Sequence, residues 1–257
     1  MIFLAYAVLA VYTIALFYIT VYCVMQFHLL YHYKRASRTA LRKQEVARPR
    51  PAVVAPKLVL ADGMDDDFPE EEEWPFVTIQ LPIYNEMYVA ERLIDNIANL
   101  DYPRDRFEVH ILDDSTDETL EITRRKVEEH QARGINIRQV RRAKRQGFKA
   151  GALRDAMPLA RGEFVAIFDA DFLPRPDFLR QTIPHFRDDQ IGVVQTRWEH
   201  INEDYSLITQ LQALQLNVHF TVEQRGRMAG NYLLQFNGTA GVWRRETIED
   251  AGGWEAD

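Results

Sequence analysis

Hydrophobic residues dominate the first 33 positions of the chain, which contain no Asp, Glu, Lys or Arg. About 20 consecutive apolar residues are enough to cross the hydrocarbon core of a bilayer as a helix. A cleavable signal peptide fits less well, because no basic segment precedes the apolar run and the run is too long. The pattern predicts one transmembrane helix at residues 1–33, with tyrosines near its far end as interfacial anchors.

From residue 76 onward, short apolar runs alternate with longer amphipathic stretches. The short runs predict β-strands at 77–81, 107–112, 135–140 and 164–168. Apolar residues at helical spacing predict helices at 88–100, 117–132 and 148–160. Such alternation is typical of an α/β domain in which a parallel or mostly parallel sheet carries helices on both faces. We expect this domain to occupy residues 75–257.

Two local patterns add detail to the helices. Ser115 and Glu118 have the spacing of a capping box and predict the start of the second helix. A further long helix is predicted at 206–224. Its apolar residues form one stripe, typical of a helix that faces a protein core: Leu207, Ile208, Leu211, Leu214 and Val218.

Charge is segregated along the chain. The net charge of −7 disfavours general nucleic-acid binding, which usually needs a basic face. Residues 34–50 are nevertheless basic, and Lys and Arg accumulate on the cytoplasmic side of a span. We therefore expect the amino terminus outside and the rest of the chain in the cytosol. The basic segment either only sets this topology, the favoured interpretation, or also contacts anionic membrane lipid. Residues 34–74 are predicted to be a linker, basic at first and then acidic and solvated. The single cysteine, Cys23, excludes an internal disulfide and a cysteine-based zinc site.

Polar side chains follow each of the four predicted strands. In a parallel sheet, ligands bind beyond the carboxyl ends of the strands, so these side chains are expected to open on one crevice. The four strand ends provide, in order, Tyr84 with Glu86, Asp113 with Asp114, a basic loop with Lys149, and Asp169 with Asp171.

The last pair is a candidate metal site. Asp169 and Asp171 project to the same side of an extended chain, and such carboxylates repel unless a cation lies between them. Oxygen ligands suit Mg²⁺ or Mn²⁺, which commonly share coordination with phosphates. Lys149, near a helix start and between Gly147 and Gly151, suits a phosphate that approaches closely. Together these groups indicate a nucleotide-diphosphate donor. Plain alternatives are a turn-capping Asp pair, a helix-capping Asp114 and a solvated Lys149.

Several motifs in order resemble a known family. They are residues 81–86, 113–115, 147–153, 169–172, 195–198, 236–245 and 252–254. Residues 76–257 resemble the family 2 inverting glycosyltransferases of the cellulose synthase and cellulose-synthase-like type, above all the glucomannan- and xyloglucan-backbone synthases. The resemblance implies a GT-A fold and a membrane-bound enzyme that moves a hexose, with inversion, from a UDP- or GDP-sugar to a polysaccharide or lipid-linked acceptor.

The resemblance also implies roles for individual residues. Tyr84, Glu86 and Asp114 would contact the base or ribose, Lys149 the diphosphate, and Asp169 both the nucleotide and, with Asp171, the metal. The acceptor end would lie at Asn237, Gly238 and Thr239. Trp198 either lines the site or packs in the core, and His200 either contacts a substrate or is an ordinary polar residue. The helix at 206–224 would lie below the membrane instead of facing a core.

The general base is not assigned. In the family it belongs to a Thr-Glu-Asp motif shortly after Gly-Gly-Trp, whereas this sequence ends at Asp257, soon after Trp254. Glu255 and Asp257 come too early to match, so the base is expected beyond Asp257. We expect the chain to be a fragment that keeps the donor site and is inactive by itself. The alternatives are an inactive nucleotide-sugar-binding module and a nucleotidyltransferase. The latter is disfavoured because a glycine-rich signature does not follow the first strand.

Overall fold

The computed structural model describes residues 2–43, 57–61 and 74–255. The chain divides into two compact units. One, the helical unit, comprises residues 1–52 and 198–235; the other, the sheet unit, comprises residues 53–197 and 236–257. The predicted limits of span, linker and domain stay predictions, and the acidic run at 65–73 lies outside the described residues.

The sheet unit is built on a mixed, mostly parallel sheet, as predicted. Its described strands lie in the order β1-β6-β7-β5-β2-β3-β4. Only β7 runs antiparallel to its neighbours, β5 and β6. The strands are β1 Lys57–Ala61, β2 Val77–Ile83, β3 Phe107–Asp113, β4 Ile137–Val140, β5 Phe164–Ile167, β6 Ile191–Thr196 and β7 Gly241–Arg244.

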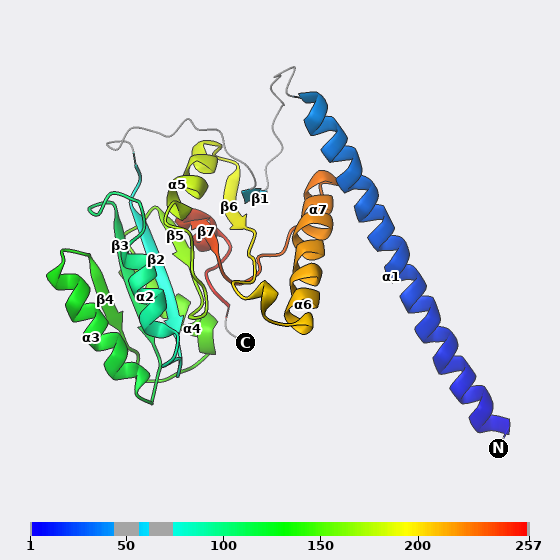
Figure 1. Ribbon diagram of the computed structural model, residues 1–257, viewed down its shortest axis with the longest axis horizontal. Coiled ribbons are helices and arrows are strands. Elements are labelled where there is room, and N and C mark those ends of the chain that lie inside the picture. The colour runs from blue at the N-terminus through cyan, green and yellow to red at the C-terminus, as the bar shows by residue number, and fades with distance from the viewer. Residues whose placement is uncertain (1, 44–56, 62–73, 256–257) are drawn as a thin grey trace. The chain divides into compact units, whose positions relative to one another are not determined.

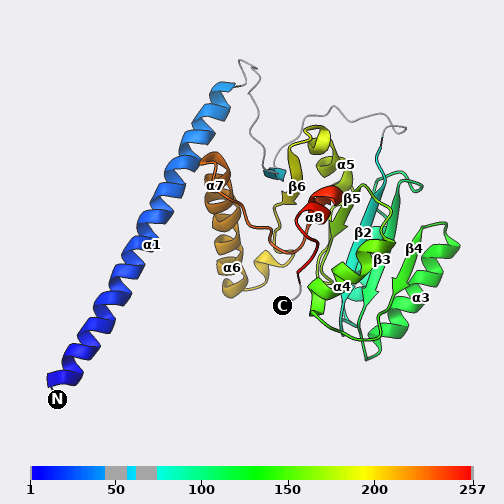
Figure 2. The same ribbon diagram turned by 180° about the vertical axis from the view of Figure 1, so that it is seen from behind.

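Helices cover both faces of this sheet (Figures 1 and 2). Figure 1 shows α2 in front of the sheet, and the reverse view in Figure 2 shows α4 and α8 in front. The central strands β2, β3 and β5 are consequently buried almost throughout, and β5 is wholly apolar, whereas β2 and β3 also bury polar residues such as Gln80 and His110. The helices are α2 Ala90–Ala98, α3 Thr119–Ala132, α4 Phe148–Ala156, α5 Phe178–Thr182 and α8 Arg245–Asp250.

Several predicted helix ends are wrong: α2 is two residues shorter at each end, and the ends of α3 and α4 differ for identifiable reasons. Helix α3 begins at Thr119, and Ser115 does not cap it: its Oγ accepts a hydrogen bond from the Asn85 backbone N–H at 3.0 Å and so joins the β2 and β3 ends. Helix α4 ends at Ala156 and continues as a 3₁₀ turn, Met157–Leu159. Pro158 lies in this turn and has no N–H with which to extend the α-helix.

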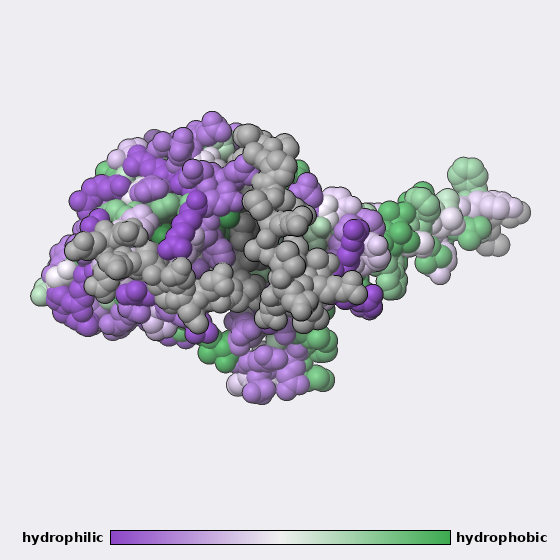
Figure 3. Space-filling view, turned by 90° about the horizontal axis from the view of Figure 1, so that it is seen from above, coloured by the Kyte–Doolittle hydropathy of each residue, from purple (hydrophilic) through white to green (hydrophobic). Residues whose placement is uncertain are grey.

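The helical unit contains α1 Ile2–Lys43, α6 Leu207–Val218, a π-helix at His219–Gln224 and α7 Arg225–Ala229. Helix α1 is long and apolar enough to cross a membrane over Phe3–Arg38, and no part of its most apolar window is buried. Hydrophobic residues gather along it at the right of Figure 3. It therefore fits the predicted amino-terminal span, although the helix itself continues past residue 33.

Close contacts join α1 to the segment after α6. A Cβ at Gly226 would lie 2.6 Å from the carbonyl oxygen of Leu29, so only glycine allows the two backbones to approach this closely. The Gln26 amide also donates to Glu223 at 2.9 Å. The apolar stripe of α6, by contrast, does not face the core of this unit, and its five predicted residues are all exposed. The core-facing interpretation of this helix is therefore wrong for the described residues.

Candidate functional site

A cleft of about 390 Å³ lies at the carboxyl ends of β2, β3 and β5 in the sheet unit. It gathers six residues that were predicted from four separate strand ends: Tyr84, Glu86, Asp114, Lys149, Asp169 and Asp171. Pro82, Ile83, Leu112, Arg145, Ala152 and Ala170 complete the lining. The structure thus brings the predicted donor-site residues together, while their individual roles stay predictions.

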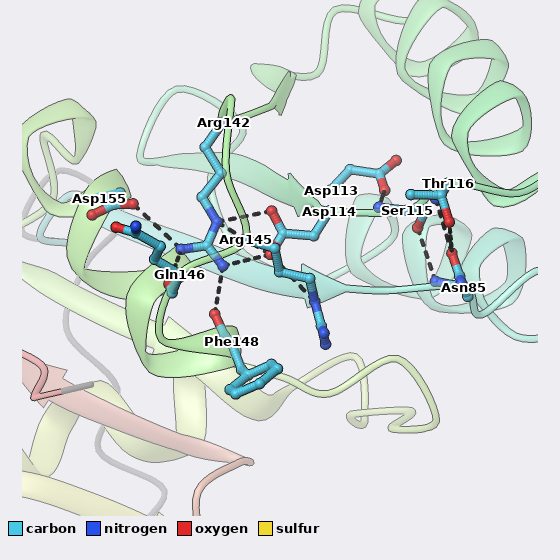
Figure 4. Close-up of polar contacts among 10 residues, drawn as sticks. All are labelled: Asn85, Asp113, Asp114, Ser115, Thr116, Arg142, Arg145, Gln146, Phe148 and Asp155. Carbon is cyan, nitrogen blue, oxygen red and sulfur yellow. Dashed lines mark hydrogen bonds and ion pairs between the residues drawn. The ribbon is translucent and has the colours of Figure 1, made fainter. Parts of the chain in front are cut away.

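The two adjacent acids after β3 have different surroundings (Figure 4). The carboxylate of Asp113 is buried, and accepts hydrogen bonds from the Ser115 N–H at 2.9 Å, the Thr123 hydroxyl at 2.5 Å and the Gln139 amide at 2.8 Å. Asp114 instead lines the cleft. Neighbouring residues of an extended chain point to opposite sides, which accounts for the division. Asp113 holds the strand ends together, and Asp114 is the acid that borders the cleft.

Asp114 is paired with an arginine that the sequence did not single out. Nε of Arg142 donates to Oδ1 at 2.9 Å and Nη2 to Oδ2 at 2.6 Å. The side chains are 12% and 8% exposed, respectively. Hydrogen bonding to this carboxylate raises the pKa of the Arg142 guanidinium above its ordinary value. The helix-cap alternative for Asp114 is therefore wrong.

Arg142 also fixes the loop between β4 and α4. Its Nη1 and Nη2 donate to the carbonyl oxygens of Gln146 and Phe148, each at 2.7 Å. The loop then enters α4 through two left-handed residues, Gly147 with φ 67° and Phe148 with φ 45°. A Cβ at Gly151 would lie 1.9 Å from the Gln146 carbonyl oxygen. Of the two alternatives for these glycines, close approach of a ligand or of another backbone, Gly151 shows the second, and Gly147 provides the left-handed turn.

Lys149 connects the donor strand ends to the predicted acceptor segment. Its Nζ donates to the carboxylate of Asp169 and, at 2.8 Å, to the carbonyl oxygen of Gly238. The backbone N–H of Asp169 donates to the Thr239 hydroxyl at 2.9 Å. Asn237 is fixed through its own N–H, which donates to Gln195 at 3.1 Å. Residues 237–239 thus lie beside Asp169, although they do not line the cleft itself.

Residues 78–249 match the model for glycosyl transferase family 2. The chain belongs to this family. It is 44% identical over 201 residues to glucomannan 4-beta-mannosyltransferase 1 of Oryza sativa subsp. japonica, an alignment that covers 76% of this chain and 39% of the relative. This likeness confirms the predicted place among the cellulose-synthase-like members.

A solved structure has the same fold. The mannosyltransferase PcManGT from Pyrobaculum calidifontis, in complex with GDP-Man and Mn²⁺, is 30% identical with a TM-score of 0.61. The match covers 90% of this chain and 56% of that one. The predicted GT-A architecture is confirmed. The chain spans well under two thirds of the length of both relatives.

The carboxylates of this family 2 domain fit a divalent cation. Asp169 and Asp171 both line the cleft, and the Lys149 ammonium pairs with Asp169, whereas Asp171 is exposed and keeps its carboxylate open to the cleft. Their oxygens are the donors that Mg²⁺ and Mn²⁺ prefer.

A second acidic group, Asp95, Glu129 and His130, does not fit a metal equally well. There the ammonium of Lys126 lies 2.6 Å from Asp95 and 2.7 Å from Glu129. Together with the His130 bond it lowers the pKa of Asp95, although burial opposes this as the largest single effect. Both carboxylates of this group are thus already paired with a cation of the protein.

Arg142 and Arg145 are the site residues that sequence reasoning missed. The sequence shows a basic loop after the third strand. It does not show that Arg142 of this loop pairs with Asp114, which lies 28 residues earlier in the chain. Trp198 and His200 fall in the helical unit, where the Trp198 ring centroid lies 5.5 Å from that of Phe220. Their predicted roles stay predictions.

Proposed function

We propose that this domain binds a GDP-hexose, with mannose as the sugar, in the cleft beyond β2, β3 and β5. An enzyme that carries this domain would transfer the hexose with inversion to a glycan acceptor. The observation that carries the proposal is the meeting of Lys149, Asp169 and Asp171 in one cleft. The family assignment and the GDP-Man complex of the 30% identical relative support it.

The proposed roles follow from charge and position. Asp169 and Asp171 would hold Mg²⁺ or Mn²⁺, which neutralises diphosphate charge when bound. Lys149 would turn its ammonium to the diphosphate, and Tyr84, Glu86 and Asp114 would contact the nucleoside. Residues 237–239, tied to Asp169 and Lys149, would border the acceptor. Inverting transfer also needs a base for the acceptor hydroxyl, and we assign none.

The amino-terminal helix would anchor this domain. Lys34, Arg35 and Arg38 follow the apolar run within α1. Basic residues at this position favour an outside amino terminus and a cytosolic domain, with the basic residues near anionic lipid. The membrane would be a plasma, inner or Golgi-type membrane.

The proposal is tested by calorimetric titration of the full chain in detergent micelles with GDP, with and without Mn²⁺ or Mg²⁺. We expect binding that strengthens with metal, and loss of that metal dependence in Asp171→Ala. Asp189→Ala, which removes an exposed acid outside the cleft, is the matched control and should bind like the parent. If the parent chain binds no nucleotide with either metal, the site assignment is wrong.

A further inference from the structure

Arg145 covers the aromatic wall of the cleft. Its guanidinium carbon lies 3.5 Å from the centroid of the Tyr84 ring and 4.8 Å from that of Phe148. A guanidinium at this distance stacks on an aromatic face through cation–π attraction. Stacking uses the face of the guanidinium and leaves its N–H donors, which lie in its plane, available to a neighbour. Arg145 and Tyr84 both line the cleft, so that neighbour can be a ligand.

The two arginines of this loop differ in what their donors do. Arg142 donates hydrogen bonds from all three of its guanidinium nitrogens to Asp114 and to the loop carbonyl oxygens. Among the described residues, Arg145 approaches one carboxylate: its Nε lies 3.9 Å from Oδ2 of Asp114, beyond hydrogen-bond reach. Figure 4 shows it beside the Arg142–Asp114 pair. One arginine is therefore a fixed part of the loop, and the other presents an uncommitted fork of donors at the cleft.

A fork of two adjacent donors selects a partner with two adjacent acceptors. Guanine presents O6 and N7 on one edge, and Arg pairs with both at once. Uracil offers a carbonyl oxygen flanked by an N–H or a C–H, so it can meet only one arm of the fork. Lys cannot reproduce the fork, because its ammonium is a point charge.

We propose that Arg145, stacked on Tyr84, reads the base of the donor nucleotide and selects guanine over uracil. This inference rests on the proposed function and adds a specificity-determining residue to it. Arg145 holds the in-plane donors in place before the nucleotide arrives, since Tyr84 and Phe148 already flank the guanidinium. The base of the nucleotide then binds to donors that are already in position.

Calorimetric titration of the full chain with GDP, UDP and 7-deaza-GDP in Mn²⁺ tests the assignment. The parent chain should bind GDP about tenfold or more tightly than UDP, which is about 1.4 kcal/mol. It should bind 7-deaza-GDP, which lacks the N7 acceptor, several-fold more weakly than GDP. Arg145→Ala and Arg145→Lys should both weaken GDP binding about tenfold and leave UDP binding within about twofold. Arg141→Ala removes an exposed arginine of the same loop outside the cleft, and should change neither.

The outcomes separate this inference from the proposed function. Equal weakening of GDP and UDP in Arg145→Ala would place the guanidinium at the phosphates and overturn the assignment. A parent chain that binds GDP, UDP and 7-deaza-GDP equally would overturn it as well, without recourse to any variant. Absence of all nucleotide binding would instead refute the proposed function. The near-ultraviolet circular dichroism of each variant must match that of the parent chain.

Discussion

Replacing Arg142 by Ala should destabilise the sheet unit strongly. The substitution removes a bidentate partner from Asp114, whose side chain is 8% exposed, and two hydrogen bonds from the carbonyls of Gln146 and Phe148. Breaking a buried ion pair from one side costs about 3–5 kcal/mol, because the remaining charge stays buried. The pair borders an open cleft, where water can reach Asp114, so the lower end of that range is expected. We expect a loss of about 3 kcal/mol.

Urea unfolding of the full chain in micelles, followed by near-ultraviolet circular dichroism, measures this loss. With a slope of about 2 kcal/mol/M, the midpoint should fall by about 1.5 M. Most of this loss of stability should come from the Asp114 carboxylate, which stays buried without its partner. The double variant Arg142→Ala, Asp114→Ala should therefore be less destabilised than the sum of the two single variants.

An exposed arginine provides the control. Arg124 forms two ion pairs as short as the one to Asp114, with Glu121 and Glu128, but all three side chains are more than half exposed. Such surface pairs contribute little, so Arg124→Ala should leave the midpoint unchanged within error. If Arg142→Ala shifts the midpoint no more than Arg124→Ala does, burial does not strengthen the Asp114 pair and the reasoning fails.

Three further predictions concern neighbouring features. Gly151→Ala places a methyl group 1.9 Å from the Gln146 carbonyl oxygen and should displace the loop. GDP affinity, measured by calorimetry, should therefore fall at least tenfold, and unchanged affinity would contradict this. Lys149→Met should weaken GDP binding similarly. It should also tighten Mn²⁺ binding in the absence of nucleotide, measured by electron paramagnetic resonance, because Asp169 loses a competing cation. Weaker Mn²⁺ binding would contradict this prediction. Burial lowers the pKa of His110 to about 4, so the unfolded chain takes up a proton near pH 6.5 that the folded chain does not. Stability should consequently fall as the pH drops from 7 toward 4, by up to about 3 kcal/mol, and His110→Gln should flatten this part of the urea midpoint profile.

The fold was largely predictable because its strongest signal is local. The central strands of the sheet are short, largely apolar and buried on both faces, as β5 illustrates over its whole length. Helix starts were less predictable because a capping residue can take another partner. Ser115 has the spacing of a cap, yet its hydroxyl accepts from Asn85 after β2, thirty residues earlier in the chain. No pattern within the α3 segment contains that information.

The site shows the same distinction. Parallel strands end at one edge of a sheet, so topology alone brings the acids and Lys149 to one cleft. Which acid lines that cleft is a different matter. Asp113 and Asp114 are chemically identical and adjacent, and only the extended geometry of the strand separates a buried structural carboxylate from one at the cleft. Arg142 escaped prediction for a related reason, because a basic loop residue is ordinarily solvated.

The network around Asp169 also explains why the strand ends do not act independently. Lys149 holds Asp169 and the carbonyl of Gly238 at the same time, and Thr239 holds the backbone of Asp169. A lysine that turns toward a diphosphate, as we propose, must leave both partners together. The carboxylate proposed to receive the cation and the segment proposed to border the acceptor would then change surroundings in one step. The segments that we propose for donor and acceptor are therefore joined both through the Lys149 ammonium and through the Thr239 hydroxyl, and a lysine that turns away would release the first of these links.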